Sequence, residues 1–156
     1  LMIKNNEPYL IEYNIRMGDP ECQVILPRLK TDLIQIIKKS VANKLKEIKI
    51  EWKKEKSMTI VLCSKGYPGK YGKNLRLSNL DRLLLTKKDY IYHAGTIIRN
   101  QELLSVGGRV LNITSLGDNF LKIRKRIISI IKKINWKHGF YRKDIGWRIT
   151  KKNENN

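Results

Sequence analysis

The first regular pattern along the chain is an alternation of apolar and polar residues that predicts a β-strand over residues 9–16. Successive side chains of a strand point to opposite faces. One face would therefore carry only apolar side chains: Tyr9, Ile11, Tyr13, Ile15 and Met17. The other would carry Glu12, Asn14 and Arg16, about 7 Å apart at the rise of a strand. We expect the apolar face to lie in a core. The alternative for the polar face is an edge strand whose side chains only meet water.

Turn and helix signals follow this strand. Gly18 permits a sharp turn, and Asp19 followed by Pro20 predicts an N-cap and a first helical residue. The helix is expected over residues 20–30, with a break or kink at Pro27.

A second helix is predicted to begin after Asp32, which can cap it, and to end at about Leu45. Its apolar residues recur at helical spacing on one face: Leu33, Ile36, Ile37, Val41 and Leu45. A polar connection over residues 49–56 then leads to the rest of the chain.

The remaining residues predict strands followed by a helix. Apolar runs predict strands over residues 58–63, 90–96 and 109–115. The last helix is expected to be capped by Asp118 and to bury one stripe of side chains: Phe120, Leu121, Ile127, Ile128, Ile131 and Ile134. This order predicts an α+β fold with a small antiparallel sheet and a packed helix. Residues 151–156, KKNENN, are expected to form a disordered tail.

Length and charge restrict the class of protein. The 156 residues suffice for one domain with a core. The net charge of +19 is typical of nucleic-acid-binding proteins. The basic excess lies outside residues 1–37, and lysine far outnumbers arginine alongside frequent Ile and Asn. We therefore attribute the excess of lysine to codon bias at solvent-exposed positions. A nucleic-acid-binding module is the alternative function.

Cysteine use and hydropathy exclude other classes. Cys22 and Cys63 form no Cys/His cluster, so the sequence offers no thiolate metal or redox motif, and both are expected to be buried. No apolar run approaches the ~18 residues of a membrane span. We expect a protein of the reducing cytoplasm with no membrane partner.

The polar face of the first predicted strand carries the donor groups of a magnesium site. The Glu12 carboxylate and the Asn14 amide oxygen are hard ligands of the kind that Mg²⁺ prefers, and Mg²⁺ completes its shell with waters and phosphates. The Arg16 guanidinium suits a phosphoryl oxygen. The glycine turn at residues 66–69 lacks the spacing of a phosphate-binding P-loop. From the residues alone, a turn without a binding role is the alternative to a functional loop there.

Five blocks of sequence resemble one family. IEYNIRMGDPECQVILPRLKTDL, at residues 11–33, resembles the end of the nucleotide-binding region of an ATP-grasp ligase. It is similar to the pattern E-F-N-x-R-F-G-D-P-E-x-Q-x-x-L-P-R-L of the phosphoribosylamine–glycine ligase (glycinamide ribonucleotide synthetase) family. Four later blocks resemble the same family in the same order: SKGYPGKY (64–71), YHAGT (92–96), GGRVLNITSLG (107–117) and FYRKDIG (140–146).

The resemblance implies a reaction and the residues that perform it. The family joins glycine to 5-phosphoribosylamine with ATP, through glycyl phosphate, in purine biosynthesis. Glu12 and Asn14 would then hold Mg²⁺, with Mn²⁺ as the alternative metal, on the phosphates of ATP. Arg16 would be the catalytic cation that stabilises the transferring phosphoryl group or the acyl phosphate. Gly18 and Asp19 would shape the substrate pocket.

A second set of substrate-binding residues follows from the later blocks. By the same resemblance, Lys65, Gly107, Gly108 and Arg109 would close over the ribose phosphate. A related ATP-grasp carboxylate–amine ligase of purine synthesis is the alternative, against which the GYPG, HAGT and GGRVLN blocks argue.

The resemblance also implies a division of the chain. Residues 1–50 would be the C-terminal end of an ATP-grasp domain, and residues 51–150 the C-terminal domain of the ligase. Because the family's enzyme is much longer, we expect a C-terminal fragment whose partner is the upstream region of the same enzyme. The isolated chain should be inactive, since the adenine pocket and a second metal-binding carboxylate would lie upstream.

Overall fold

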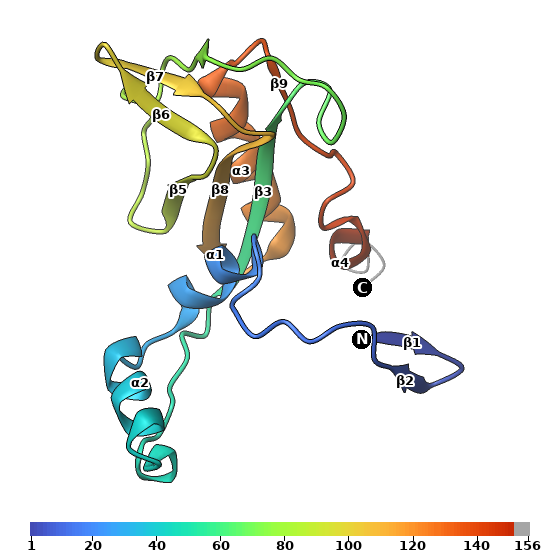
Figure 1. Ribbon diagram of the computed structural model, residues 1–156, viewed down its shortest axis with the longest axis vertical. Helices are drawn as coiled ribbons and strands as arrows, with labels where there is room; N and C mark the ends of the chain where they lie inside the picture. The colour runs from blue at the N-terminus through green and yellow to red at the C-terminus, as the bar shows by residue number, and fades with distance from the viewer. Residues whose placement is uncertain (152–156) are drawn as a thin grey trace.

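A four-stranded antiparallel sheet forms the centre of the computed structural model, which describes residues 1–151. Its strand order is β5-β8-β3-β9, with β5 at Asp89–His93, β8 at Arg109–Gly117, β3 at Lys56–Ser64 and β9 at Gly139–Phe140. The helix α3 (Phe120–Ile134) packs along β3 and β8 (Figure 1). Helices and an antiparallel sheet thus share one core, as the α+β prediction requires.

The two nine-residue strands β3 and β8 pair over nearly their whole length. Ile60 pairs with Ile113 and Leu62 with Leu111, and the register shifts between Leu62 and Cys63. Partners across an antiparallel ladder point to the same face, so these apolar pairs all face α3. They meet a stripe of buried isoleucines on that helix: Ile123, Ile127, Ile130, Ile131 and Ile134.

The strand predictions are confirmed at the centre of the sheet and incomplete at its edges. The predicted strands 58–63 and 109–115 lie within β3 and β8. The predicted strand 90–96 was wrong in extent, because β5 ends at His93 and the chain bends through Gly95. The next strands form a second, three-stranded sheet of order β4-β7-β6: β4 (Leu75–Arg76), β6 (Thr96–Arg99) and β7 (Glu102–Ser105).

The caps of the helices differ from the predictions in two cases. Asn119, and not Asp118, caps α3, because its side-chain oxygen accepts hydrogen bonds from the backbone amides of the first turn at 2.8 and 3.1 Å. Pro20, and not Asp19, occupies the N-cap of α1 (Glu21–Ile25). The predicted helix 20–30 is therefore shorter, and it continues as a 3₁₀ turn at Leu26–Arg28 that contains Pro27.

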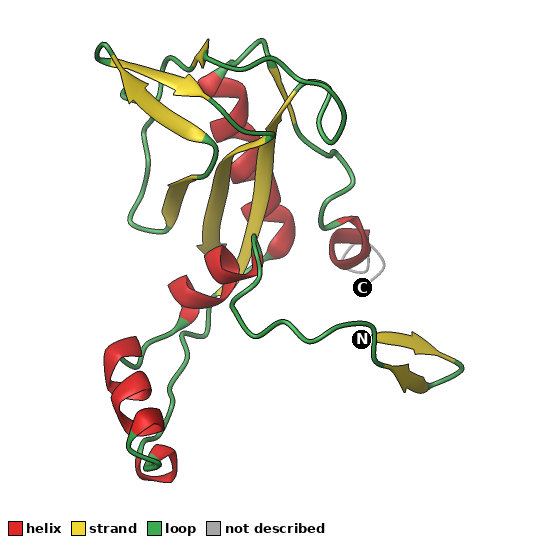
Figure 2. Ribbon diagram, viewed as in Figure 1, coloured by secondary structure: helices red, strands yellow, loops and turns green. Residues whose placement is uncertain are grey.

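Asp32 caps the second helix as predicted. Its carboxylate accepts a hydrogen bond from the backbone N–H of Gln35 at 2.9 Å, and α2 runs over Leu33–Val41. The helix ends before the predicted Leu45 because Asn43 takes a left-handed backbone with φ of 56°. A 3₁₀ turn at Leu45–Glu47 follows. No residue of α2 is buried, and Figure 2 shows this helix set apart from the sheet.

The predicted strand at residues 9–16 was wrong. The chain instead forms a short hairpin of β1 (Met2–Lys4) and β2 (Glu7–Tyr9), and residues 10–17 have no regular structure. Within residues 1–151, no strand pairs with this segment. A strand needs hydrogen-bonding partners and an apolar surface to cover, and here the apolar face meets solvent: Tyr13 is 81% and Ile15 99% exposed.

The C-terminal helix extends into the predicted tail, and only one of the two cysteines is buried. The helix α4 (Trp147–Lys151) takes in the first residue of the predicted tail, and residues 152–156 lie outside the described part. Cys63 is buried as predicted, whereas Cys22 is only half-buried. No helix within residues 1–151 is both long and apolar enough to cross a membrane.

A buried carboxylate ties β5 and β8 to α3. The Asp89 side chain is 2% exposed, and it accepts hydrogen bonds from Arg126 at 2.7 and 3.1 Å, from the Ser115 hydroxyl at 2.6 Å, and from Thr86 at 2.7 and 2.8 Å. Burial by itself would raise the pKa of Asp89. The hydrogen bonds from Arg126, Ser115 and Thr86 outweigh it and hold that pKa well below its usual range.

We predict that Asp89→Asn lowers the free energy of unfolding at pH 7 by about 2–3 kcal/mol, because it removes the charge from these hydrogen bonds. The depressed pKa makes this contribution fully present above the unfolded-state pKa of about 4. It is lost as the pH falls from there toward the folded-state pKa. Urea unfolding at several pH values should therefore show the gap between wild type and variant closing in acid.

The exposed Asp118→Asn serves as the matched control, with little effect expected at any pH. A gap for Asp89→Asn that stays constant down to acid pH would contradict the assigned ionisation.

Candidate functional site

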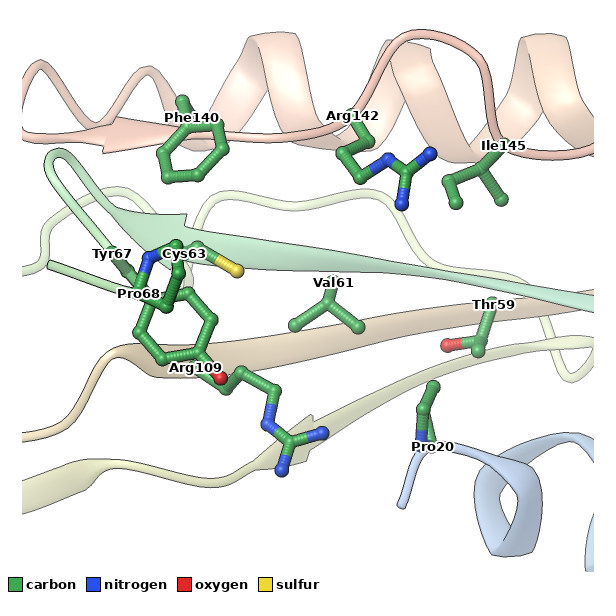
Figure 3. Close-up of a pocket in the computed structure, with 10 residues that line it drawn as sticks. All are labelled: Pro20, Thr59, Val61, Cys63, Tyr67, Pro68, Arg109, Phe140, Arg142 and Ile145. Atoms are coloured by element: carbon green, nitrogen blue, oxygen red, sulfur yellow. The ribbon is translucent and has the colours of Figure 1, made fainter. Parts of the chain in front are cut away.

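A cavity of about 470 Å³ lies on the face of β3 away from α3. Figure 3 shows the residues that line it: Pro20, Thr59, Val61, Cys63, Tyr67, Pro68, Arg109, Phe140, Arg142 and Ile145. They come from the start of α1, from β3, from the turn after β3, from the start of β8, and from the segment 140–145. The volume lies within the range of small-molecule sites.

The alternation of side chains along β3 creates this cavity. Met58, Ile60 and Leu62 belong to the core beneath α3. The intervening side chains therefore point to the opposite face, where Thr59, Val61 and Cys63 form the floor of the cavity (Figure 3). One strand thus serves the core with one face and the candidate site with the other.

Arg109 connects the first helix to the edge of the cavity. Its Nη1 donates to the backbone carbonyl of Asp19 at 3.0 Å, and its Nη2 lies 3.4 Å from Oδ2 of the Asp19 carboxylate. The Gln23 amide donates to the other carboxylate oxygen at 3.1 Å. Two residues that are 90 positions apart in sequence, both predicted to bind substrate, therefore lie in direct contact.

The two glycines before Arg109 allow close packing against the turn at residues 66–69. A Cβ on Gly108 would lie 2.0 Å from Cδ2 of the Tyr67 ring, so only glycine leaves that ring where it is. The Gly107 carbonyl accepts a hydrogen bond from the Ser64 hydroxyl at 2.9 Å. A Cβ on Gly107 would in turn lie 2.9 Å from the Cα of Gly95. The glycines shape the wall of the cavity without lining it themselves.

The thiol of Cys63 faces the cavity from its floor (Figure 3). Burial raises the pKa of Cys63, and the positive charge of Arg109 offsets part of that rise. A raised pKa lowers the fraction of the nucleophilic thiolate, and the side chain supplies part of the cavity floor.

The three polar residues of the first segment lie outside the cavity. The Asn14 amide donates to Oε1 of Glu12 at 3.0 Å, so these two side chains meet even though the segment is not a strand. The Arg16 guanidinium donates to the backbone carbonyl of its neighbour Met17 at 2.9 Å. All three residues are exposed.

The pair formed by Glu12 and Asn14 fits magnesium in the kind of its donors. A carboxylate and an amide supply hard oxygens, and a two-residue set leaves positions for phosphates and waters. Residues 1–151 contain no group of three or more His, Cys, Asp or Glu side chains that could hold a metal. These two residues would thus need ligand oxygens from elsewhere to complete the shell.

The predicted substrate-binding residues occupy different places. Arg109 lines the cavity, Asp19 contacts Arg109, and Gly18 precedes α1, where its carbonyl accepts a hydrogen bond from the Cys22 amide at 2.9 Å. Lys65 is exposed and does not line the cavity; its backbone amide donates to the His138 carbonyl at 2.8 Å.

Sequence reasoning did not select two residues that line the cavity beside Arg109. Tyr67 and Arg142 are absent from the predicted site. Both lie within blocks that resemble the ligase family, SKGYPGKY and FYRKDIG. Those blocks were the available signal, whereas composition and spacing gave none.

Comparison with known proteins identifies similar sequences and a similar structure. Residues 57–148 match the family described as phosphoribosylglycinamide synthetase, C domain. The chain is 42% identical over 148 residues to a phosphoribosylamine–glycine ligase of Agrobacterium fabrum, covering 95% of this chain and 34% of that protein. It is 37% identical over 153 residues to the chloroplastic enzyme of Arabidopsis thaliana, covering 97% of this chain and 29% of the relative.

A solved structure agrees with the sequence matches. The crystal structure of a phosphoribosylamine–glycine ligase from Thermotoga maritima superposes with a TM-score of 0.70 at 26% identity. The superposition covers 92% of this chain and 34% of that one. The chain therefore spans about a third of the length of the relatives that it matches.

We predict that Gly108→Ala destabilises the fold by about 1–3 kcal/mol, because the added methyl group collides with the Tyr67 ring. In a Tyr67→Ala background the same substitution should cost less than about 0.5 kcal/mol, since the collision is gone. Chemical unfolding of the four proteins in this double-mutant cycle measures the coupling. An equal cost in both backgrounds would show that Tyr67 does not lie on Gly108.

Proposed function

We propose, from the premise that this chain belongs to the phosphoribosylglycinamide synthetase family, that it supplies the C-terminal third of a phosphoribosylamine–glycine ligase. The reaction would join glycine to 5-phosphoribosylamine at the expense of ATP, through glycyl phosphate. The observation that carries the proposal is the contact between Asp19 and Arg109 at the edge of the cavity. Both residues lie within blocks that resemble the family, and the contact unites those blocks in one site.

Charge neutralisation is the main physical task of such a ligase. The glycine carboxylate must approach the γ-phosphate of ATP, so two anions have to meet. Glu12 and Asn14 would bind Mg²⁺ or Mn²⁺ through their side-chain oxygens, and the metal would supply positive charge to the nucleotide phosphates. Arg16 would stabilise the phosphoryl group during transfer with its guanidinium. Their exposure leaves all three side chains accessible to a nucleotide bound by another part of the enzyme.

The cavity would hold the second substrate. Arg109 presents a cationic group at its edge and would bind the phosphate of the ribose substrate. Asp19 fixes the Arg109 guanidinium through two contacts, and Gly18 gives the chain its turn into α1. Gly107 and Gly108 let the Tyr67 wall approach, and Lys65, in the adjoining turn, would approach the phosphate when the enzyme closes.

The chain would divide into two functional parts. Residues 1–50 would complete an ATP-grasp domain, and residues 51–150 would form the ligase's C-terminal domain. The apolar side chains exposed on residues 9–17 support this division, because an ATP-grasp sheet elsewhere in the enzyme would cover them. The partners would be glycine, 5-phosphoribosylamine, ATP and the remaining part of the enzyme, in the cytoplasm. The net charge of +19 is the sole support for a nucleic-acid-binding module.

We predict that the full-length ligase, in which this chain is joined to the remaining two thirds of the enzyme, forms ADP only when both glycine and phosphoribosylamine are present. Glu12→Ala and Asn14→Ala should each lower kcat by about 100-fold or more, because each removes an oxygen ligand of the metal that would neutralise the phosphates. A coupled ADP-release assay over a range of Mg²⁺ concentrations measures both effects.

The matched control is Glu7→Ala, which removes an exposed carboxylate from the neighbouring hairpin and should leave the rate unchanged. Full activity in Glu12→Ala and Asn14→Ala would refute the metal assignment. A wild-type enzyme that forms no ADP with both substrates would refute the proposed reaction.

We further predict that the 156-residue chain alone forms no ADP under the same conditions, because ATP would be held mostly by the remaining part of the enzyme. The assay is the same, run at high protein concentration, with full-length ligase as the positive control. Turnover that depends on glycine and phosphoribosylamine would contradict this division of labour.

A further inference from the structure

A second arginine lines the cavity from the side opposite Arg109. Among the ten lining residues, Arg109 and Arg142 carry charge and none is acidic. Arg109 lies at the start of β8, and Arg142 follows β9 on the segment that covers the other side of β3 (Figure 3). Each guanidinium is ion-paired with a carboxylate that does not line the cavity, Asp19 for Arg109 and Asp144 for Arg142. The two arginines therefore border the cavity as oriented hydrogen-bond donors, which suit an anionic ligand.

The Arg142 guanidinium is held in a defined orientation. Its Nε donates to one oxygen of Asp144 at 3.0 Å and its Nη2 to the other at 2.5 Å. This two-point contact fixes the plane of the guanidinium, and Nη1 has no part in it. A guanidinium has five N–H donors, so Arg142 can hold Asp144 and still donate to a ligand.

The neutral lining residues suit a sugar more than a second ion. Val61, Phe140 and Ile145 supply apolar surface against which the C–H groups of a furanose can pack. The Tyr67 hydroxyl points into the cavity beside Arg109 (Figure 3), where it can hydrogen-bond to a sugar hydroxyl. Apolar walls with a few placed polar groups are typical of small-molecule sites.

We propose that Arg142 is a second ligand-binding residue of this site and acts with Arg109 on one sugar phosphate. The ligand class is a ribose 5-phosphate ester, whose dianionic phosphate is drawn to the two guanidiniums while its ring lies over the apolar floor. This assignment rests on the proposed function, because it identifies the ligand with the ribosyl substrate of the ligase. Asp144 is a positioning residue that keeps the Arg142 guanidinium in place.

Isothermal titration of the 156-residue chain with ribose 5-phosphate tests the assignment directly. Arg142→Gln should weaken binding at least about 10-fold, since a hydrogen bond to a charged group is lost. Arg142→Lys, which keeps the charge without the planar fork, should give an intermediate loss. The matched control is Arg148→Gln on α4, which removes the same charge outside the cavity and should change the affinity less than twofold.

Three results would overturn the proposal. One is affinity that is unaltered in Arg142→Gln, and another is equal weakening in Arg148→Gln, which would reduce the effect to net charge. The third is the absence of saturable binding of ribose 5-phosphate to the wild-type chain. Titration with inorganic phosphate separates a sugar-phosphate site from a plain anion site: binding of inorganic phosphate that is tighter than binding of ribose 5-phosphate would also refute the sugar-phosphate assignment.

Kinetics of the full-length ligase distinguish this proposal from the proposed function. Arg142→Gln should raise the KM for phosphoribosylamine at least about 10-fold with little change in kcat, because the residue contributes to binding. An active enzyme whose KM does not depend on Arg142 refutes this inference and leaves the ligase function intact. An inactive wild-type enzyme whose chain still binds ribose 5-phosphate through Arg142 refutes the ligase function and leaves the site intact.

Discussion

The antiparallel pairing of β3 with β8 is the constraint on which the rest of the structure depends. Because side chains alternate along a strand, one face of this ladder forms the floor of the core and the other face forms the floor of the cavity. Leu62 packs beneath α3, while its neighbours Val61 and Cys63 face the candidate site. A shift of register by one residue would exchange the two sets of side chains. The ladder therefore fixes the stability of the fold and the position of the candidate site together.

The N-terminal segment meets the β3–β8 pair through α1 and the 3₁₀ turn at Leu26–Arg28. Arg109 contacts Asp19 just before α1, and Arg28 and Lys30 form backbone hydrogen bonds with residues 51–53. Residues 10–17 lie beyond these contacts and expose their apolar side chains. The chain thus presents two surfaces with different physical requirements. The cavity is built within the chain, whereas the polar row at Glu12, Asn14 and Arg16 requires further ligand groups from elsewhere.

Local sequence signals predicted the elements that carry their own hydrophobic pattern. The strands around Ile60 and Ile113 appear where periodicity placed them. The stripe predicted on α3 was only half right: Ile127, Ile131 and Ile134 are buried, whereas Phe120, Leu121 and Ile128 are half-buried, and the buried Ile123 and Ile130 were not predicted. The pattern at residues 9–16 did not become a strand, because a strand depends on partners that periodicity does not supply. The N-cap of α3 is Asn119 and not the predicted Asp118. Because Asn and Asp cap helices about equally well, residue type alone could not distinguish these two neighbours. The cavity residues Tyr67 and Arg142 come together only through the tertiary fold, which no local pattern encodes.

The metal assignment to Glu12 and Asn14 is tested by the position of the metal in the full-length ligase crystallised with Mn²⁺ and a non-hydrolysable ATP analogue. The anomalous signal of manganese locates the ion independently of any rate measurement. We expect a peak bound directly by a Glu12 carboxylate oxygen and the Asn14 amide oxygen together with phosphate oxygens. A nucleotide-bound manganese ion that neither side chain contacts would contradict this assignment.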